Sequence, residues 1–211
     1  LTGHLLRRDC LTAPIPAADY AKHSEKLLLL PDLGIVSKGD VGSVLLFGAR
    51  PIDQMRDIAL PSDSSTSRAL LQWVLRRNNL DPKFHETGPD LVAMLEKSDG
   101  ALLIGDRALI AAKENPELVK LDLGAEWTQI TGFPMVFGVF AARKDSNLSK
   151  LNRARNDMVN QYNQFLHDES WRDGVISRTS SKLGFSVSRI SEYFLVEVQN
   201  KLDDESKEGL E

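Results

Sequence analysis

The chain has 211 residues, of which 42% are hydrophobic and 27% are charged, and its formal net charge is −4. The length fits one large domain or two small lobes, and the hydrophobic fraction is sufficient for a buried core. The acidic balance gives no basic surface for nucleic acid, and the single cysteine, Cys10, excludes an internal disulfide and a cysteine-based metal cluster. No apolar run is long enough to cross a bilayer and no signal-peptide pattern opens the sequence, so we expect a cytoplasmic protein without a membrane partner.

Strand-like and helix-like segments alternate along the chain. Apolar runs and turn residues predict a short strand and turn in 10–20, an apolar segment and glycine-containing loop before a strand at 43–48, then strands at 57–60, 83–86 (an edge strand) and 100–106, with the longest strand in 133–145. Helical spacing predicts helices from Ser67, over 89–97 with Pro89 in the first turn, over 107–115 before Pro116, through most of the chain after Asp145, and finally near 190–202.

The alternation of strands and helices in the middle of the chain predicts an α/β protein with parallel strands. Two long apolar strands, Val44–Gly48 and Met135–Ala141, flank this middle part. We therefore expect two lobes joined by these two crossing strands. Lobe 1 comprises residues 1–48 and 140–211, and lobe 2 comprises residues 49–139. A ligand would bind in a cleft between the lobes, at the carboxyl ends of strands.

Five hydroxyl side chains lie where the strand at 57–60 leads into a helix: Ser62, Ser64, Ser65, Thr66 and Ser67. Free N–H groups and the helix dipole favour an anion at such a helix start, and hydroxyls add donors without adding charge. Capping would need only one of them, although it remains an alternative. No Walker pattern is present, so a carboxylate is the expected ligand rather than a nucleotide phosphate.

Further candidate residues lie before and after this cluster in the sequence. The loop "SKGDVGS", Ser37–Ser43, contains two glycines, which allow close approach to a ligand or an ordinary turn. Asp106 follows a buried strand and faces either a ligand or, as an N-cap, its own helix. Thr131 and Gly132 precede the return strand, where they could form a pocket wall. No metal-binding spacing and no cofactor fingerprint is present, so neither a metal nor a cofactor is expected.

Four runs together resemble the chorismate dehydratase family of menaquinone biosynthesis by the futalosine route. They are "LPDLGIVSKGDVGSVLLF", "IALPSDSSTSRALL", "ALLIGDRAL" and "LDLGAEWTQITGFPMVFGVFAAR", in the order and spacing of the family from about Leu30 to Arg143. The resemblance implies a type II periplasmic-binding-protein-like fold used as a cytoplasmic lyase, with chorismate, a small dicarboxylate, as its substrate.

The resemblance also implies a reaction and roles for several residues. Chorismate would lose its ring hydroxyl as water, together with a neighbouring ring hydrogen, to give 3-[(1-carboxyvinyl)oxy]benzoate. Such an elimination needs a base near the ring hydrogen and a donor to the leaving hydroxyl, and a carboxylate of the substrate is one candidate base. Ser43 matches a serine of the family's glycine-containing stretch and is the expected catalytic residue. Its alternative is a hydroxyl bonded to its own backbone. The substrate-binding residues are then Ser37, Ser64, Ser65, Thr66, Ser67, Asp106, Thr131 and Gly132.

The first lobe differs from the family pattern in one expected respect. Members of the family begin with a strand and a Tyr-Leu-Asn-type motif, and this sequence starts downstream of that position. We therefore expect lobe 1 without that first strand and a site without that asparagine. Two alternative functions remain: a non-catalytic small-carboxylate-binding protein of the same fold, and the related naphthoate-forming synthase of the same pathway.

Overall fold

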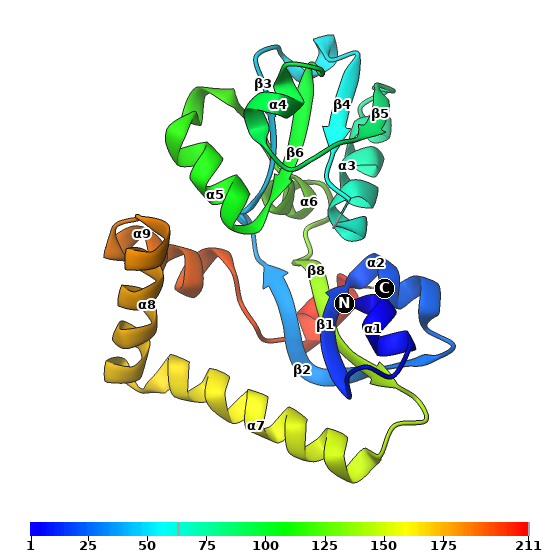
Figure 1. Cartoon of the computed structure of the whole chain (residues 1–211), viewed down its shortest axis with the longest axis vertical. Coiled ribbons are helices and arrows are strands. Elements are labelled where there is room, and N and C mark those ends of the chain that lie inside the picture. Colours follow the sequence, from blue (N-terminus) through cyan, green and yellow to red (C-terminus); the bar gives the residue numbers. More distant parts are fainter. Residues whose placement is uncertain (63, 211) are drawn as a thin grey trace. The chain divides into compact units, whose positions relative to one another are not determined.

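The structure, a computed structural model, describes residues 1–62 and 64–210 and consists of two compact units. Unit 1 comprises Leu1–Val36 and Val136–Glu211, and unit 2 comprises Ser37–Met135 (Figure 1). Along the chain, the first boundary between the units lies after residue 36, 12 residues before the expected residue 48. The second lies after residue 135, four residues before the expected residue 139. The chain passes between them after β2 (Leu27–Ser37) and at the start of β8 (Met135–Arg143).

Unit 1 is built on a three-stranded sheet in the order β1-β8-β2, where β1 is Thr12–Pro16. β1 and β8 are antiparallel, with Ala13 opposite Ala141. The unit also contains α1 (Thr2–Leu6), α2 (Ala17–His23) and α10 (Asp204–Glu208). Its core is a cluster of small and branched side chains: Leu5, Ala13, Ile15, Ala17, Leu27, Val36, Val136, Val139, Ala141 and Leu202.

The long helices of unit 1 follow β8, as the sequence predicts. They are α7 (Leu148–His167), α8 (Glu169–Leu183) and α9 (Val187–Glu192), which continues into a π-helical turn at Tyr193–Glu197. The helix expected near 190–202 therefore ends at Glu197, and α10 begins only at Asp204. In α7 only Leu151 is buried, and it packs with Leu30 and Ala142. One side chain thus anchors the first turn of this 20-residue helix.

Unit 2 is built on a five-stranded sheet in the order β5-β4-β6-β3-β7. The strands are β3 (Val44–Gly48), β4 (Asp57–Leu60), β5 (Lys83–Glu86), β6 (Gly100–Ile104) and β7 (Val119–Asp122). β4 is parallel to β5 and to β6, whereas β3 is antiparallel to β6 and to β7. The expectation of parallel strands is therefore correct for the β5-β4-β6 part only. β3 is a central strand of unit 2, so its assignment as a crossing strand of lobe 1 was wrong.

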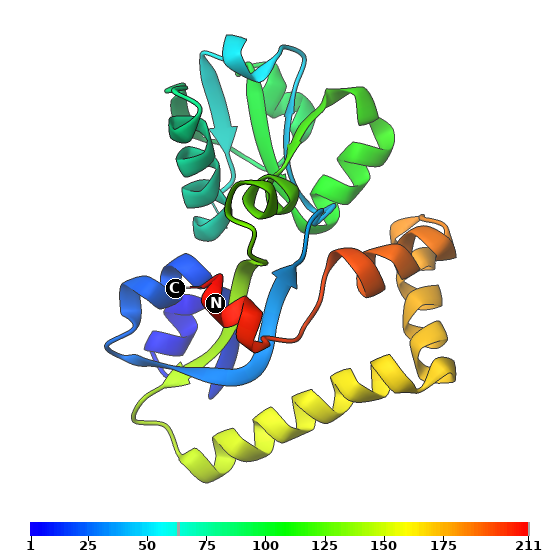
Figure 2. The same cartoon turned by 180° about the vertical axis from the view of Figure 1, so that it is seen from behind.

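Helices cover both faces of the unit 2 sheet because its central strands are apolar on both sides. Leu45, Phe47, Ala101 and Leu103 lie in a core cluster with residues of α4 (Leu91–Leu95) and α5 (Gly105–Glu114). On the other side α3 (Ser65–Arg77) packs against α6 (Leu123–Thr131), as the reverse view shows (Figure 2).

The remaining differences from the predicted elements have local causes. β2 has 11 residues and β8 nine, so the return strand is not the longest. Pro89 lies outside α4, because Asp90 is the N-cap and accepts a hydrogen bond from the Ala93 N–H. α5 ends at Glu114, before Pro116, as expected. β7 and α6 had no predicted counterpart, and their half-buried residues lack a clear apolar period.

Candidate functional site

One edge of the unit 2 sheet collects most of the predicted site residues. β4, β5 and β6 run in one direction, and β7 shares it because both β6 and β7 are antiparallel to β3. The carboxyl ends of β4, β6 and β7 therefore lie at the same edge as the start of β3. At this edge α3, α5 and α6 begin, and Ser43 precedes β3. Carboxyl ends of strands are where ligands bind in open α/β sheets.

The hydroxyl cluster lies at the start of α3, as predicted. Ser64 is the N-cap residue, but its side chain makes no capping hydrogen bond, and the described first turn contains no acidic residue. Ser64, Thr66 and Ser67 are buried, Ser65 is half-buried and Ser62 is exposed. The capping alternative therefore does not account for Ser64. The positive end of this 13-residue helix and its buried hydroxyls form an environment that suits a carboxylate.

Ser43 is fixed between two glycines whose backbones need the left-handed conformation. Gly42 precedes it with a φ of 63°, and Gly105, with a φ of 61°, donates its N–H to the Ser43 carbonyl oxygen at 2.7 Å. Ser43 itself is only 5% exposed. Its backbone is therefore attached to the start of α5, next to the carboxyl end of β6.

Asp106 lies in the first turn of α5 and is exposed. The N-cap of this helix is Ile104, so the alternative reading of Asp106 as the N-cap residue was wrong. An acidic side chain in this position is favourable for the helix dipole whether or not a ligand binds. The structure places Asp106 at the edge of the sheet, and its predicted contact with substrate stays a prediction.

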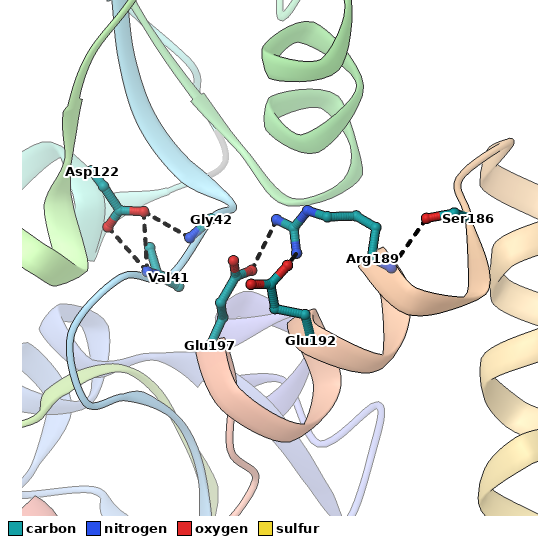
Figure 3. Close-up of polar contacts among 7 residues, drawn as sticks. All are labelled: Val41, Gly42, Asp122, Ser186, Arg189, Glu192 and Glu197. Atoms are coloured by element: carbon teal, nitrogen blue, oxygen red, sulfur yellow. Dashed lines mark hydrogen bonds and ion pairs between the residues drawn. The ribbon is translucent and has the colours of Figure 1, made fainter. Parts of the chain in front are cut away.

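The carboxylate of Asp122, at the end of β7, connects the Ser37–Ser43 loop to α6 (Figure 3). It accepts hydrogen bonds from the Gly42 N–H at 2.7 Å and from the Val41 N–H at 3.0 and 3.1 Å. It also caps α6 by accepting from the N–H groups of Gly124 and Ala125, at 2.9 and 3.1 Å. One side chain therefore satisfies four backbone donors from two segments.

Burial raises the pKa of Asp122 above its ordinary value of 3.8, and the charge of Asp40 adds to this effect. Hydrogen bonds from the N–H groups of Val41, Ala125 and Gly42 act in the opposite direction, because they stabilise the carboxylate. The net direction is upward, so desolvation is the larger effect. The ionised form that holds the loop is therefore less favourable than that of a solvent-exposed aspartate.

Ser37 lies under the first turn of α6. It is fully buried, and its Oγ atom makes no hydrogen bond among the residues that the structure describes. A Cβ atom on Gly124 would lie 2.6 Å from this oxygen and 2.6 Å from the Gly39 carbonyl oxygen. Gly124 therefore lets the helix approach the loop, and Ser37 retains an unused buried hydroxyl near the sheet edge.

Thr131 and Gly132 lie at the opposite end of α6 from Asp122. The Thr131 hydroxyl donates to the Trp127 carbonyl oxygen at 2.8 Å and accepts from the Phe133 N–H at 3.1 Å. Gly132 ends the helix in the left-handed conformation, with a φ of 78°. Both residues thus have a structural role at a helix end, and the structure does not bring them to the group at the start of α3, α5 and α6.

Sequence reasoning missed Asp122, Gly124 and Thr128 as residues that shape this edge. Thr128 accepts a hydrogen bond from the Gly39 N–H at 3.2 Å. The stretch "LDLGAEWT" carries a usable signal, since an aspartate two residues before a glycine fits an N-cap followed by a closely packed helix turn. The contact of Asp122 with a loop 80 positions away has no such signal.

Two other features of the described residues, an ion-pair cluster and an apolar groove, do not resemble a site for a dicarboxylate. In unit 1 Arg189 forms ion pairs with Glu197 at 3.0 Å and with Glu192 at 3.8 Å, so its charge is already compensated (Figure 3). A groove of about 400 Å³ in unit 1 is mainly aromatic and apolar. Its lining residues are Leu33, Phe140, Met158, Gln161, Tyr162, Phe165, Trp171, Val175, Phe194 and Asn200.

Residues 1–62 and 64–210 contain no group of three or more His, Cys, Asp or Glu side chains that could hold a metal ion. Within the same ranges, every helix is too short or too polar to span a bilayer.

The fold defines the class of this protein as periplasmic-binding-protein-like. A protein of Archaeoglobus fulgidus superposes with a TM-score of 0.76 and 18% identity, over 100% of this chain and 79% of that one. A Candida albicans protein with the generic periplasmic binding protein fold superposes with a TM-score of 0.61 and 16% identity, over 99% and 74%. These likenesses confirm the expected fold class.

The chain belongs to the menaquinone biosynthesis family, whose family model matches residues 1–211. It is 33% identical to the chorismate dehydratase of Thermus thermophilus over 176 residues. This match covers 74% of the chain and 65% of the relative, so the chain spans less than two thirds of the relative's length. The resemblance derived from the four sequence runs is thereby confirmed at the level of the family.

Proposed function

We propose that this protein is a chorismate dehydratase, a lyase that removes water from chorismate to give 3-[(1-carboxyvinyl)oxy]benzoate in the futalosine route to menaquinone. The family match and the similarity to a chorismate dehydratase support the pathway and the substrate. The observation that carries the proposal is the grouping at one sheet edge of buried hydroxyls, three helix starts and Ser43. We further propose a cytoplasmic location and the small-molecule dicarboxylate chorismate as the partner.

Binding of the dicarboxylate is assigned to the start of α3. One carboxylate of chorismate accepts hydrogen bonds from the hydroxyls of the cluster and from N–H groups at the start of the helix. Ser64 and Ser67 are the strongest candidates, because both are buried beside these N–H groups. Ser65 and Thr66 extend the same surface, and Ser37 and Asp106 border it in our proposal.

Ser43 is assigned to the reacting end of the substrate. The elimination breaks one ring C–H bond and the bond between the ring and its hydroxyl, and the proton and the hydroxide together form water. A base removes the ring proton, and a donor stabilises the departing hydroxyl, for which we propose the Ser43 hydroxyl. A carboxylate of the substrate serves as the base in this proposal. Aromatisation supplies much of the driving force, so the protein's main contribution is orientation.

Mass spectrometry after incubation of the purified protein with chorismate tests the proposal. We expect a product lighter than chorismate by one water molecule, formed at a rate proportional to the protein concentration. A non-catalytic carboxylate-binding protein would instead bind chorismate in calorimetry and return it unchanged. The naphthoate-forming synthase would leave chorismate unchanged, and calorimetry would show no specific binding of chorismate.

A further inference from the structure

The Ser37–Ser43 loop is held by α6. Its N–H groups cannot all pair within the loop, because Gly39 and Gly42 have φ angles of 116° and 63° and turn the backbone away from strand geometry. Asp122 accepts from the N–H groups of Val41 and Gly42, and Thr128 accepts from that of Gly39. Three backbone N–H groups of the loop are therefore bonded to two side chains, one within α6 and one at its N-cap.

The contact between the loop and α6 is close as well as polar. Gly124, in the first turn of α6, leaves no room for a Cβ atom, since Ser37 Oγ and the Gly39 carbonyl oxygen would each lie 2.6 Å from it. Side-chain Cβ atoms do not approach other atoms this closely in folded proteins. A displacement of α6 would therefore move the loop backbone directly.

Asp122 also constrains the backbone of Ser43, because it bonds to the preceding residue, Gly42. Gly42 donates to Asp122 at 2.7 Å, and the next residue, Ser43, accepts from the Gly105 N–H at 2.7 Å. The backbone of Ser43 is thus fixed on one side by Asp122 and on the other by the start of α5. Without the Asp122 contact only one of these two constraints remains.

We propose that Asp122 is a positioning residue of this site, whose carboxylate fixes the Ser37–Ser43 loop and thereby the place of the Ser43 hydroxyl during the reaction. The inference rests on the proposed function, because the Ser43 role belongs to it. Asp122 touches neither the substrate nor the reacting atoms in this account. It acts through the Gly42 and Val41 backbone, and a loss of placement of about 1 Å at a reacting group can lower turnover by about a hundredfold.

A simple helix-capping role is the competing explanation, and the chain contains a matched control for it. Asp90 is also an N-cap aspartate of unit 2 and accepts from the Ala93 N–H at 2.9 Å. Asp122→Asn retains one carbonyl oxygen but turns an NH₂ group, which cannot accept, toward one of the two sets of N–H donors. Asp90→Asn makes the same chemical change at a helix start outside the Ser37–Ser43 loop.

The experiment compares wild type, Asp122→Asn and Asp90→Asn in two measurements. Steady-state kinetics with chorismate separates kcat from KM, and hydrogen exchange follows the amides of Val41 and Gly42. We expect Asp122→Asn to lower kcat by roughly 10- to 100-fold with KM changed less than about threefold, and to decrease the protection of the Val41 and Gly42 amides. Asp90→Asn should resemble the wild type in both measurements.

Three results would overturn the inference. They are a folded Asp122→Asn protein with wild-type kcat, an equal loss in Asp90→Asn, and unchanged protection of Val41 and Gly42. If Asp122→Asn does not fold, Gly124→Ala is the second test of the contact between α6 and the loop. This variant keeps the carboxylate, but its new Cβ atom would collide with Ser37 and Gly39 and displace the loop. It should lower kcat in the same way, and full turnover in folded Gly124→Ala would contradict the inference. If the wild type leaves chorismate unchanged, the proposed function fails, whereas amide protection still tests the loop contact.

Discussion

The Gly42 N–H donates a 2.7 Å hydrogen bond to the carboxylate of Asp122, although the two residues are 80 positions apart in the chain. The bond joins the loop before β3 to the last residue of β7, and these strands are neighbours in the unit 2 sheet. Two segments with no sequence relationship are thus combined at one edge. The following predictions test what this edge and the rest of the fold do.

Replacement of Thr66 and Ser67 by alanine should weaken substrate binding. Both side chains are buried in the first turn of α3, where the proposed carboxylate binds. A hydrogen bond to a charged group contributes about 1.5–3 kcal/mol, so we expect Kd for chorismate to rise about tenfold to a hundredfold. Calorimetry measures the change. Ser62→Ala removes an exposed hydroxyl from the same stretch and should leave Kd unchanged, while tight binding by a folded double variant would refute the assignment.

Ser43→Ala should lower the turnover of chorismate far more than it lowers stability. A donor to a leaving group contributes about a hundredfold or more to the rate, whereas loss of one hydroxyl hydrogen bond costs about 1 kcal/mol of folding free energy. The matched control is Ser98→Ala. Ser98 is also buried, bonds to His85 Nε2 at 2.6 Å and precedes β6, at the opposite edge of the sheet. Equal turnover of the two variants would exclude the role of Ser43 and leave Ser37 as the next candidate.

Leu151→Ala should destabilise unit 1 much more than Leu148→Ala. Leu151 is 3% exposed and packs with Leu30 and Ala142, whereas Leu148, one turn earlier in α7, is 63% exposed. Truncation of a buried leucine costs about 2–5 kcal/mol, and truncation of an exposed one changes stability by about 0.5 kcal/mol or less. Urea unfolding measures both. Similar unfolding midpoints would mean that Leu151 is not the anchor of α7.

The stability of unit 1 should decrease on acidification through the titration of Asp145. Hydrogen bonds from Arg143 lower the pKa of this carboxyl below 3.8, and the charges of Arg143 and Arg8 act in the same direction. A lowered folded-state pKa means that the stabilisation is present above pH 3.8 and is lost as the pH falls through the folded-state pKa. Asp145→Asn should therefore flatten the dependence of the urea midpoint on pH in that acidic window. Asp157→Asn removes the same charge from an exposed position on α7, and an equal flattening there would contradict the role of Asp145.

The strands of unit 2 could be predicted from the sequence where a continuous apolar run is buried on both faces. β4 and β6 are such runs: β4 lies at the expected residues, and β6 begins at the expected residue 100 but ends at Ile104, two residues before the expected end. β7 could not be found in this way, because none of its residues is fully buried and Lys120 interrupts the pattern. β3 was located correctly but assigned to the wrong unit, since an apolar run does not specify which strands it will pair with.

The candidate site was predictable to the extent that it depends on local sequence. The hydroxyl cluster was placed correctly at the start of α3, because a strand end and a helix start are both local patterns. The relation of Ser43 to Gly105 and of Gly42 to Asp122 depends on the order of strands in the sheet. That order is a property of the folded chain, and so the support of the loop by α6 was not accessible to sequence patterns.

Proton NMR of a chorismate solution after addition of the protein tests the central claim most directly. The account predicts that the ring signals of chorismate are replaced by those of a meta-substituted benzoate, while the vinyl protons of the carboxyvinyl ether are retained. Retention of the carboxyvinyl ether distinguishes dehydration from removal of pyruvate and from a rearrangement that moves the side chain to a ring carbon. Unchanged chorismate, free pyruvate, or a product without the carboxyvinyl ether would contradict the account.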